Sequence, residues 1–211
     1  MLIHYSKVCE ILRRFNISVK GILHVGAHEC EELMDYIRGG VNIQNIVWIE
    51  GNEEKVQLMK GKGVPNVYHG LVSDKAGETV KFYITNNGQS SSILELETHK
   101  IHHPHVYVSE TKEQKTTTIE TIFQENGLDG SIYNFWNMDI QGAELMAIKG
   151  AGDLIKNVDA FYLEVNEEEL YKGCGLIGEI DAYLRVHGFE RVETSMTQFK
   201  WGDALYVRMR V

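Results

Sequence analysis

The chain has 211 residues, of which 43% are hydrophobic and 24% are charged, and its formal net charge is −9. This length suffices for one domain with a substantial core, and the composition excludes a disordered or membrane-spanning chain. The negative charge argues against nucleic acid as the main partner, because phosphate binding needs a basic surface. Cys9, Cys30 and Cys174 are scattered without metal-ligand spacing. With no signal-peptide pattern, we expect free thiols and a cytoplasmic location.

The first third of the chain alternates between helical and strand patterns. Apolar residues recur on one helical face over residues 5–15, which predicts a helix within an N-terminal segment of residues 1–20. Hydrophobic patterns and the glycines between them predict the next elements. These are a strand at 22–26, a helix at 31–38, a strand at 46–50, a helix at 53–60, a strand at 67–72 and an extra β segment at 80–84.

Hydrophobic periodicity is lost between residues 85 and 116. This stretch contains three serines at 90–92 and three histidines at 102–105. Long irregular segments inside compact domains are often functional lids, so we predict a substrate-covering loop over residues 85–116. We do not favour a zinc site at the histidines, because zinc ligands usually come from separated elements.

Strands and helices alternate again in the second half of the chain. The predicted elements are a helix at 117–127, a strand at 133–138, a helix at 143–149, a strand at 160–164, a helix at 176–188 and strands at 189–194 and 204–211. The last two strands have no helix between them, so we expect a hairpin that adds an antiparallel strand. The alternation elsewhere implies a mostly parallel sheet covered on both faces. We therefore predict one three-layer α/β/α domain over residues 1–211.

Polar positions at predicted strand ends carry the candidate chemistry. The stretch Ile22–Cys30 runs from a strand through a turn at Gly26 into a helical pattern, as ligand-binding turns do, although the full dinucleotide-binding glycine pattern is missing. Glu50 ends the second main strand, near the offset at which an acidic residue meets ribose hydroxyls. Asp139 and Glu164 end two later strands, and open α/β sheets bind ligands at that edge.

Several stretches resemble the motifs of FkbM-type methyltransferases, namely Ile22–Cys30, Leu71–Asp74, Ser90–Ser92, Met138–Ala151 and Trp201–Tyr206. The run Asp139-Ile140-Gln141-Gly142-Ala143-Glu144, followed by Lys149-Gly150-Ala151, is quite specific to that family. The resemblance implies a class I, Rossmann-like methyltransferase domain with a seven-stranded sheet and S-adenosyl-L-methionine as its cofactor. The chain has His24 where the family usually has Asp, and Cys30 where it often has Gly.

The resemblance also implies roles for individual residues. The residues expected to bind the cofactor are Gly26, Ala27, His28, Glu50, Asn52, Val72, Ser73 and Asp139. In this arrangement the turn at Gly26 wraps the aminoacyl part, Glu50 holds the ribose and Asn52 lies near the adenine. Ser91 and Ser92 are expected at the rim of the pocket, where they contact the substrate. Separately from the resemblance, His103 of the histidine-rich loop is a further candidate for substrate binding.

Methyl transfer from a sulfonium to a hydroxyl group sets two requirements. The acceptor oxygen, the methyl carbon and the sulfur must lie in line, and a base must take the hydroxyl proton. Asp139 is the first candidate for this catalytic role, followed by Glu164 and His28. A divalent magnesium or manganese ion bound by Asp139 and Glu164 is an alternative that we favour less, because two carboxylates are an incomplete ligand set.

The leading hypothesis is an O-methyltransferase that acts on a hydroxyl of a sugar or glycan, and the preference for a sugar rests on the resemblance. A small natural product is the alternative acceptor. The competing functions are an NAD(P)-dependent oxidoreductase and a non-catalytic Rossmann-like binding domain. We expect no membrane span, and the sequence does not predict the oligomeric state.

Overall fold

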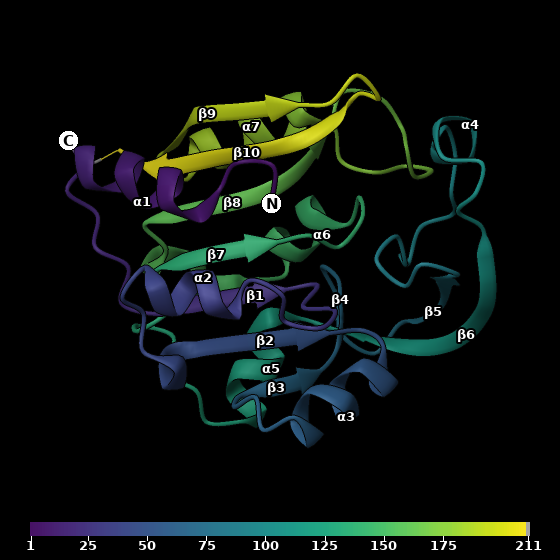
Figure 1. The fold of residues 1–211 in the computed structure, drawn as a ribbon, viewed down its shortest axis with the longest axis horizontal. Coiled ribbons are helices and arrows are strands. Elements are labelled where there is room, and N and C mark those ends of the chain that lie inside the picture. The colour runs from purple at the N-terminus through teal and green to yellow at the C-terminus, as the bar shows by residue number, and fades with distance from the viewer. Residues whose placement is uncertain (210–211) are drawn as a thin grey trace.

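The computed structural model describes residues 1–209, and its centre is a seven-stranded β-sheet (Figure 1). The strands are β1 (Ile22–Val25), β2 (Ile46–Glu50), β3 (Val67–His69), β7 (Phe135–Met138), β8 (Ala160–Asn166), β9 (Phe189–Met196) and β10 (Trp201–Arg208). Their spatial order is β3-β2-β1-β7-β8-β10-β9. The first five are parallel, and β10 is antiparallel to both β8 and β9. The predicted sheet, mostly parallel with an antiparallel C-terminal strand, is therefore confirmed.

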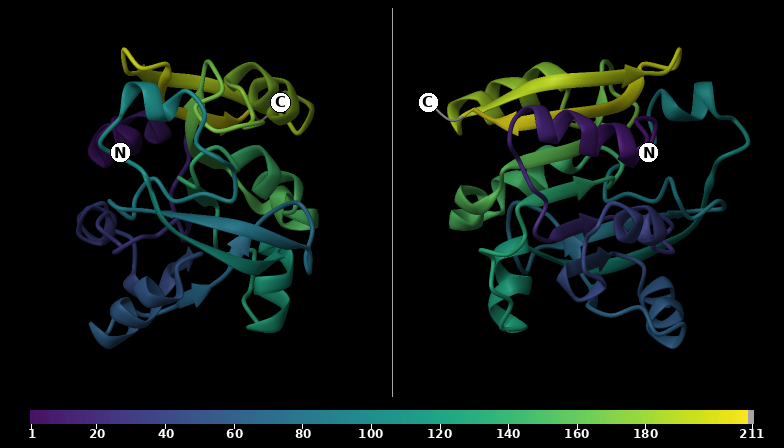
Figure 2. Two further views of the ribbon diagram at one scale, coloured as in Figure 1. Left: turned by 90° about the vertical axis from the view of Figure 1, so that its right-hand side faces the viewer. Right: turned by 60° about the vertical axis from the view of Figure 1, so that its left-hand side comes forward.

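Helices cover both faces of this sheet and complete three layers. Helices α1 (Tyr5–Arg14), α2 (Leu33–Arg38) and α3 (Glu53–Gly61) pack on one face. Helices α5 (Ile119–Glu125), α6 (Glu144–Lys149) and α7 (Ile177–Val186) pack on the other (Figures 1 and 2). Two 3-10 turns, Ile43–Asn45 and Gly152–Asn157, lie in connections. Among residues 1–209, no helix combines the length and the apolar character that crossing a membrane requires.

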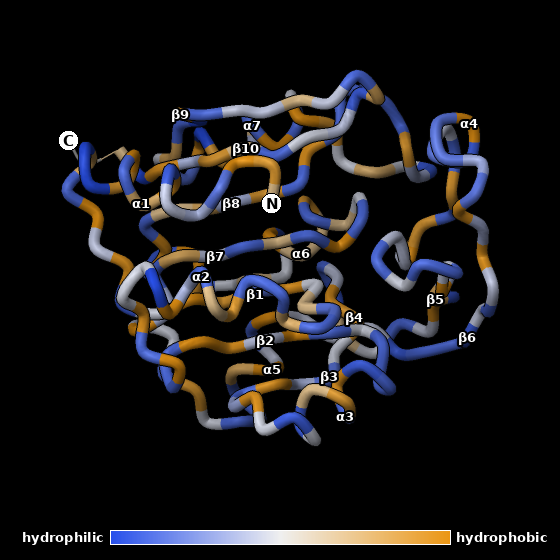
Figure 3. Tube along the Cα trace, viewed as in Figure 1, coloured by the Kyte–Doolittle hydropathy of each residue, from blue (hydrophilic) through white to orange (hydrophobic). Residues whose placement is uncertain are grey.

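A second, three-stranded sheet extends beyond the carboxyl ends of the parallel strands. It contains β4 (Leu71–Val72), β5 (Thr79–Thr85) and β6 (Val108–Thr117) in the order β4-β6-β5. The short helix α4 (His99–His102) lies in the connection between β5 and β6. Figure 1 shows this connection beyond the strand ends, and Figure 3 shows that β6 is largely hydrophilic whereas the central strands are rich in hydrophobic residues. The second sheet and the connection between β5 and β6 therefore partly cover the carboxyl ends of the parallel strands.

The structure corrects three predictions. The expected loop over residues 85–116 is wrong for residues 108–116, which belong to β6. That strand is exposed along most of its length and has no apolar alternation, so a hydrophobic pattern could not reveal it. The strand expected over 67–72 is divided at Gly70, and its halves join different sheets. The last strand begins at Trp201 instead of 204, and residues 210–211 of that prediction lie outside the described residues.

The turn after β1 lies directly against the turn after β7. The parallel register pairs Val25 with Met138, so Gly26 and Asp139 follow at the same level of the sheet edge. Gly26 has a φ of +86°, and a Cβ at this position would lie 1.8 Å from the carbonyl oxygen of Asp139. Glycine is needed here both for its backbone conformation and for the space that it leaves.

We expect Gly26→Ala to destabilise the domain by more than about 3 kcal/mol, because the new methyl group would overlap the backbone of Asp139. Gly63→Ala is the matched control, since Gly63 has a φ of +79° but a Cβ there would meet no atom within 4 Å. The loss of stability in Gly63→Ala should stay near the cost of the backbone conformation alone, about 1 kcal/mol. Urea unfolding measures both, and equal losses would show that the contact with Asp139 is not the constraint.

Candidate functional site

A cavity of about 520 Å³ lies at the carboxyl ends of the parallel strands. Three neighbouring strands bring carboxylates to it, with Asp139 after β7, Glu164 in β8 and Asp203 in β10. Neighbouring strands are about 4.8 Å apart, so these side chains form a row across the sheet edge. The segment between β5 and β6 lines the cavity through His99 and His103.

A narrower pocket of about 50 Å³ continues from this cavity toward β2. The two share Gly26, His28 and Asp139 among their lining residues, so they meet at the β1 and β7 turns. The apolar residues that line the narrow pocket include Val25, Ile49, Leu71, Val72, Phe82 and Ile140. Such a lining suits a flat, apolar ring system.

Glu50 is fixed by backbone groups beside the narrow pocket. Its Oε2 accepts a hydrogen bond from the His28 N–H at 2.7 Å, and its Oε1 accepts one from the Asn52 N–H at 2.7 Å. Burial raises the pKa of Glu50, and these two hydrogen bonds offset part of that rise. Each carboxylate oxygen can accept a further hydrogen bond, so Glu50 can also receive two ligand hydroxyls.

Gln141 joins two acidic residues of the cavity. Its Nε2 donates to the Asp139 carboxylate at 2.5 Å and to the Glu164 carboxylate at 2.7 Å. The Tyr171 hydroxyl donates to Oε1 of Gln141, which fixes the donor and acceptor ends of the amide. Gln141 has a φ of +56° and Gly142 a φ of +97°. The backbone thus takes an uncommon conformation that places one amide between two carboxylates.

The buried side chain of Glu144 holds this turn through hydrogen bonds to its backbone. Its side chain is 1% exposed, and its Oε1 accepts hydrogen bonds from the backbone N–H groups of Ile140 at 2.8 Å and Gly142 at 3.3 Å. Burial raises the pKa of Glu144 to about 8, although these hydrogen bonds lower it in part. Glu144 lines neither pocket, so it is a positioning residue for the turn that carries Asp139.

Asp139 and Glu164 have different environments although they share one amide. Burial, followed by the nearby Asp139 carboxylate, raises the pKa of Glu164 well above its ordinary value. Asp139 lines both pockets whereas Glu164 lines only the larger one, so Asp139 is the carboxylate at the point where the two pockets meet. Among residues 1–209, no group of three or more His, Cys, Asp or Glu side chains is arranged to hold a metal ion.

The structure brings most of the predicted site residues to these two pockets. The narrow pocket is lined by Gly26, His28, Glu50, Val72, Ser91, Ser92 and Asp139. The larger cavity is lined by Gly26, His28, His103, Asp139 and Glu164. Ser92 also joins the segment that follows β5 to the Asp139 turn, because its hydroxyl donates to the Gln141 carbonyl at 2.8 Å.

Three residues predicted to bind the cofactor line neither pocket. Ala27 is buried in the core beneath α1 to α3, and its N–H donates to a β2 carbonyl. Asn52 caps α3, where its side chain accepts a hydrogen bond from the Glu54 N–H. Ser73 is buried, and its hydroxyl donates to Asp74. Their side chains therefore shape the surroundings of the pockets.

The cavity also contains residues to which the sequence reasoning gave no role. His24 lines it from β1, and its Nδ1 lies 3.0 Å from the Tyr36 hydroxyl. Its signal in the sequence was the replacement of the family's Asp. Asp203 belongs to the Trp201–Tyr206 motif, but it lies near the beginning of an antiparallel strand. A search at the ends of predicted parallel strands therefore could not find it.

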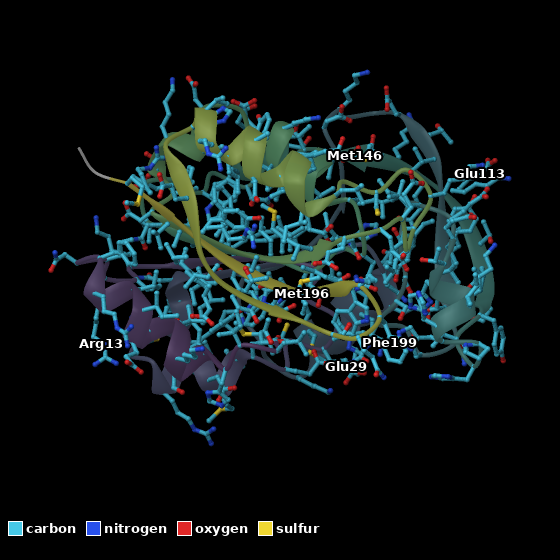
Figure 4. The ribbon with its side chains drawn as sticks, turned by 90° about the horizontal axis from the view of Figure 1, so that it is seen from above. Arg13, Glu29, Glu113, Met146, Met196 and Phe199 are labelled. Carbon is cyan, nitrogen blue, oxygen red and sulfur yellow. The ribbon has the colours of Figure 1, made fainter. Side chains whose placement is uncertain are left out.

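The segment between β5 and β6 rests against the connection between β9 and β10. The His103 and His102 rings lie 4.9 Å and 5.5 Å, between centroids, from the Phe199 ring, which Figure 4 labels. Nε2 of His102 lies 2.9 Å from the Glu168 carboxylate. These contacts hold the segment over the strand ends, where the lid was predicted.

The fold and the two joined pockets define a Rossmann-like α/β protein with its ligand site at the strand ends. The sequence profile of the methyltransferase FkbM domain matches residues 24–191, and the chain belongs to this family. The predicted family of S-adenosylmethionine-dependent methyltransferases is thereby confirmed, and a methyltransferase is favoured over an NAD(P)-dependent oxidoreductase. No curated protein matches the chain.

Three solved structures of methyltransferases are similar to the chain. The METTL16 methyltransferase domain has a TM-score of 0.51 and 11% identity, with 97% of this chain and 66% of that chain covered. Magnesium protoporphyrin IX methyltransferase from Synechocystis PCC 6803 with bound SAM has a TM-score of 0.48 and 12% identity, with coverages of 97% and 77%. M. capricolum TrmK in complex with S-adenosyl-homocysteine has a TM-score of 0.49 and 4% identity, with coverages of 95% and 67%. At such low identity the METTL16 likeness establishes the fold alone.

We expect Glu144→Gln to stabilise the domain at pH 8 by about 1–2 kcal/mol and to change its stability little at pH 4. Between 4.5 and about 8 the folded state keeps a proton that the unfolded state has released, so wild-type stability falls as the pH rises through this range. Glutamine keeps an oxygen acceptor for the turn and has no charge to bury. Urea unfolding at both pH values measures the effect, with the exposed Glu125→Gln as control. An equal gain at both pH values would contradict the assignment.

Proposed function

We propose that this protein transfers a methyl group from S-adenosyl-L-methionine to a hydroxyl group of a sugar or glycan. The observation that carries the proposal is the meeting of the two pockets at Asp139. On one side is an apolar pocket with a fixed carboxylate, and on the other is a polar cavity. The family supports methyl transfer, and the polar lining of the larger cavity supports an acceptor rich in hydroxyl groups.

The residues around the narrow pocket fit an adenosine group. The free lone pairs of Glu50 can accept hydrogen bonds from both ribose hydroxyls, and Val72 and Phe82 can contact the adenine ring. The turn at Gly26 and His28 would hold the aminoacyl part where the two pockets meet. When bound, S-adenosylmethionine supplies a methyl group activated by its sulfonium.

Asp139 is positioned to take the proton of the accepting hydroxyl group. When the methyl group passes from the sulfonium to the oxygen, this proton would move to a carboxylate oxygen of Asp139. Gln141 holds that carboxylate in place, so the reaction pays little entropy to orient the base. Glu164 lines the same cavity and is joined to Asp139 through Gln141, so it can also hydrogen-bond to the acceptor.

The role of Glu50 can be tested by calorimetric titration with S-adenosylhomocysteine. We expect Glu50→Gln to weaken binding at least about 10-fold, because one carboxylate oxygen is replaced by an amide group that cannot accept hydrogen bonds. The wild type should bind the 2′-deoxy analogue more weakly than it binds S-adenosylhomocysteine. The Glu50→Gln variant should bind the two ligands with nearly equal affinity, because the partner of the 2′-hydroxyl is already lost.

Glu54→Gln is the control for this titration, because Glu54 is exposed at the beginning of α3. Thermal unfolding of each variant shows whether the β1 turn is retained, since Glu50 also accepts backbone hydrogen bonds there. A folded wild-type protein that binds no S-adenosylhomocysteine would overturn the proposed function. Strictly additive losses in the variant and the analogue would overturn the ribose role.

The role of Asp139 can be tested by its conversion to asparagine. Loss of a general base typically slows turnover about 10²–10⁴-fold, and we expect Asp139→Asn to fall in this range. Affinity for S-adenosylhomocysteine should change less than about 3-fold, because the amide is nearly the same size. Transfer of labelled methyl groups to a panel of sugars measures turnover, and a variant with wild-type turnover would exclude Asp139 as the base.

A further inference from the structure

The cavity that would receive the acceptor has an excess of negative charge. Five carboxylates line it, from Glu31, Glu32, Asp139, Glu164 and Asp203. No lysine or arginine side chain of the described chain lines it. Burial raises the pKa of Asp203, and the α-amino group of Met1 offsets a small part of that rise. The His28 ring lies 2.6 Å from the Glu31 carboxylate, so Glu31 has a basic neighbour, whereas Glu164 and Asp203 have no basic side chain of the described residues against them. An anionic acceptor would be repelled from such a cavity.

Two of these acids, Glu164 and Asp203, face each other directly in the sheet. They are register partners on the antiparallel strands β8 and β10, and each is only 6% exposed. Oδ2 of Asp203 accepts hydrogen bonds from the Leu2 N–H at 2.5 Å and from the Tyr162 hydroxyl, both of which are neutral donors. Directly opposed buried acids are unfavourable unless a proton or a cation lies between them.

Three of the five histidines that line the cavity do not neutralise these acids. Burial lowers the pKa of His24, that of His99 to about 4 and that of His103, so all three rings are uncharged at neutral pH. His99 is 5% exposed, and its Nδ1 is buried without a hydrogen-bond partner among the described residues. An uncharged ring nitrogen of this kind can accept a hydrogen bond from a donor-rich ligand.

We infer that the acceptor carries a protonated amino group, as an amino sugar does, and that this group binds at Glu164 and Asp203 while a neighbouring hydroxyl faces Asp139. The inference rests on the proposed function and specifies its acceptor. An ammonium group has three N–H donors and no acceptor, which matches a pair of carboxylates.

The charge of the cofactor does not satisfy this pair. The proposed cofactor site lies at β1 and β2, whereas β10 is three strands from β1, a distance of about 14 Å across the sheet. The Asp203 end of the cavity therefore remains for the acceptor. The amino group also distinguishes this acceptor from neutral and acidic sugars.

The test compares three sugars of one ring size by calorimetric titration of the whole chain saturated with S-adenosylhomocysteine. Glucosamine carries the charge, N-acetylglucosamine keeps the nitrogen without the charge, and glucuronate reverses the charge. We expect glucosamine to bind at least 10-fold more tightly than N-acetylglucosamine, and glucuronate to show no binding. Equal affinities for the first two sugars, or no binding of any sugar by a chain that binds S-adenosylhomocysteine, would overturn the inference.

Two variants locate the amino group in the cavity. Asp203→Asn and Glu164→Gln should each reduce the preference for glucosamine at least 5-fold while affinity for S-adenosylhomocysteine is kept. Glu113→Gln is the control, because Figure 4 shows Glu113 on β6 at the outer edge of the molecule. An unchanged preference in both site variants would overturn the inference. A folded wild-type protein that does not bind S-adenosylhomocysteine would instead refute the proposed function, so the two failures are distinguishable.

Discussion

The contact between Gly26 and the backbone of Asp139 is the constraint on which the site depends. The parallel pairing of β1 with β7 brings the two turns to one level, and the missing side chain of Gly26 lets them touch. Both pockets meet at this contact. The residue proposed to accept a proton is thereby fixed beside the turn proposed to hold the cofactor. The backbone therefore sets how close the Gly26 turn and the Asp139 turn lie.

The electrostatics of the site follow from the burial of several acids with few cations nearby. Glu144 and Glu164 are buried, and each has a raised pKa because the low dielectric surroundings disfavour its charged form. Gln141 places its amide between Asp139 and Glu164, so these two acids share a neutral donor. The shared amide holds the two side chains next to each other without a charge between them.

Sequence patterns predicted the main sheet, its covering helices and the strand-end acids, because all depend on hydrophobic periodicity and on the topology of parallel strands. They missed β6, whose two faces are largely exposed, and they gave no role to Asp203, which reaches the same edge from an antiparallel strand. Glu144 stands in the family motif, but the sequence alone does not predict what its side chain binds. Only the three-dimensional turn shows its two backbone hydrogen bonds. The cofactor role of Asn52 stays a prediction, since its side chain caps α3.

The position of β10 has a consequence for how the domain is assembled during synthesis. Although β10 follows β9 in the chain, it lies between β8 and β9 in the sheet. Strand β9 therefore cannot join the sheet until β10 has left the ribosome and inserted beside β8. Domains fold largely as units as the chain emerges. The side of the cavity that contains Asp203 is thus completed last. Until then the nascent protein exposes an unpaired edge of β8, which can pair with a wrong strand or bind a chaperone.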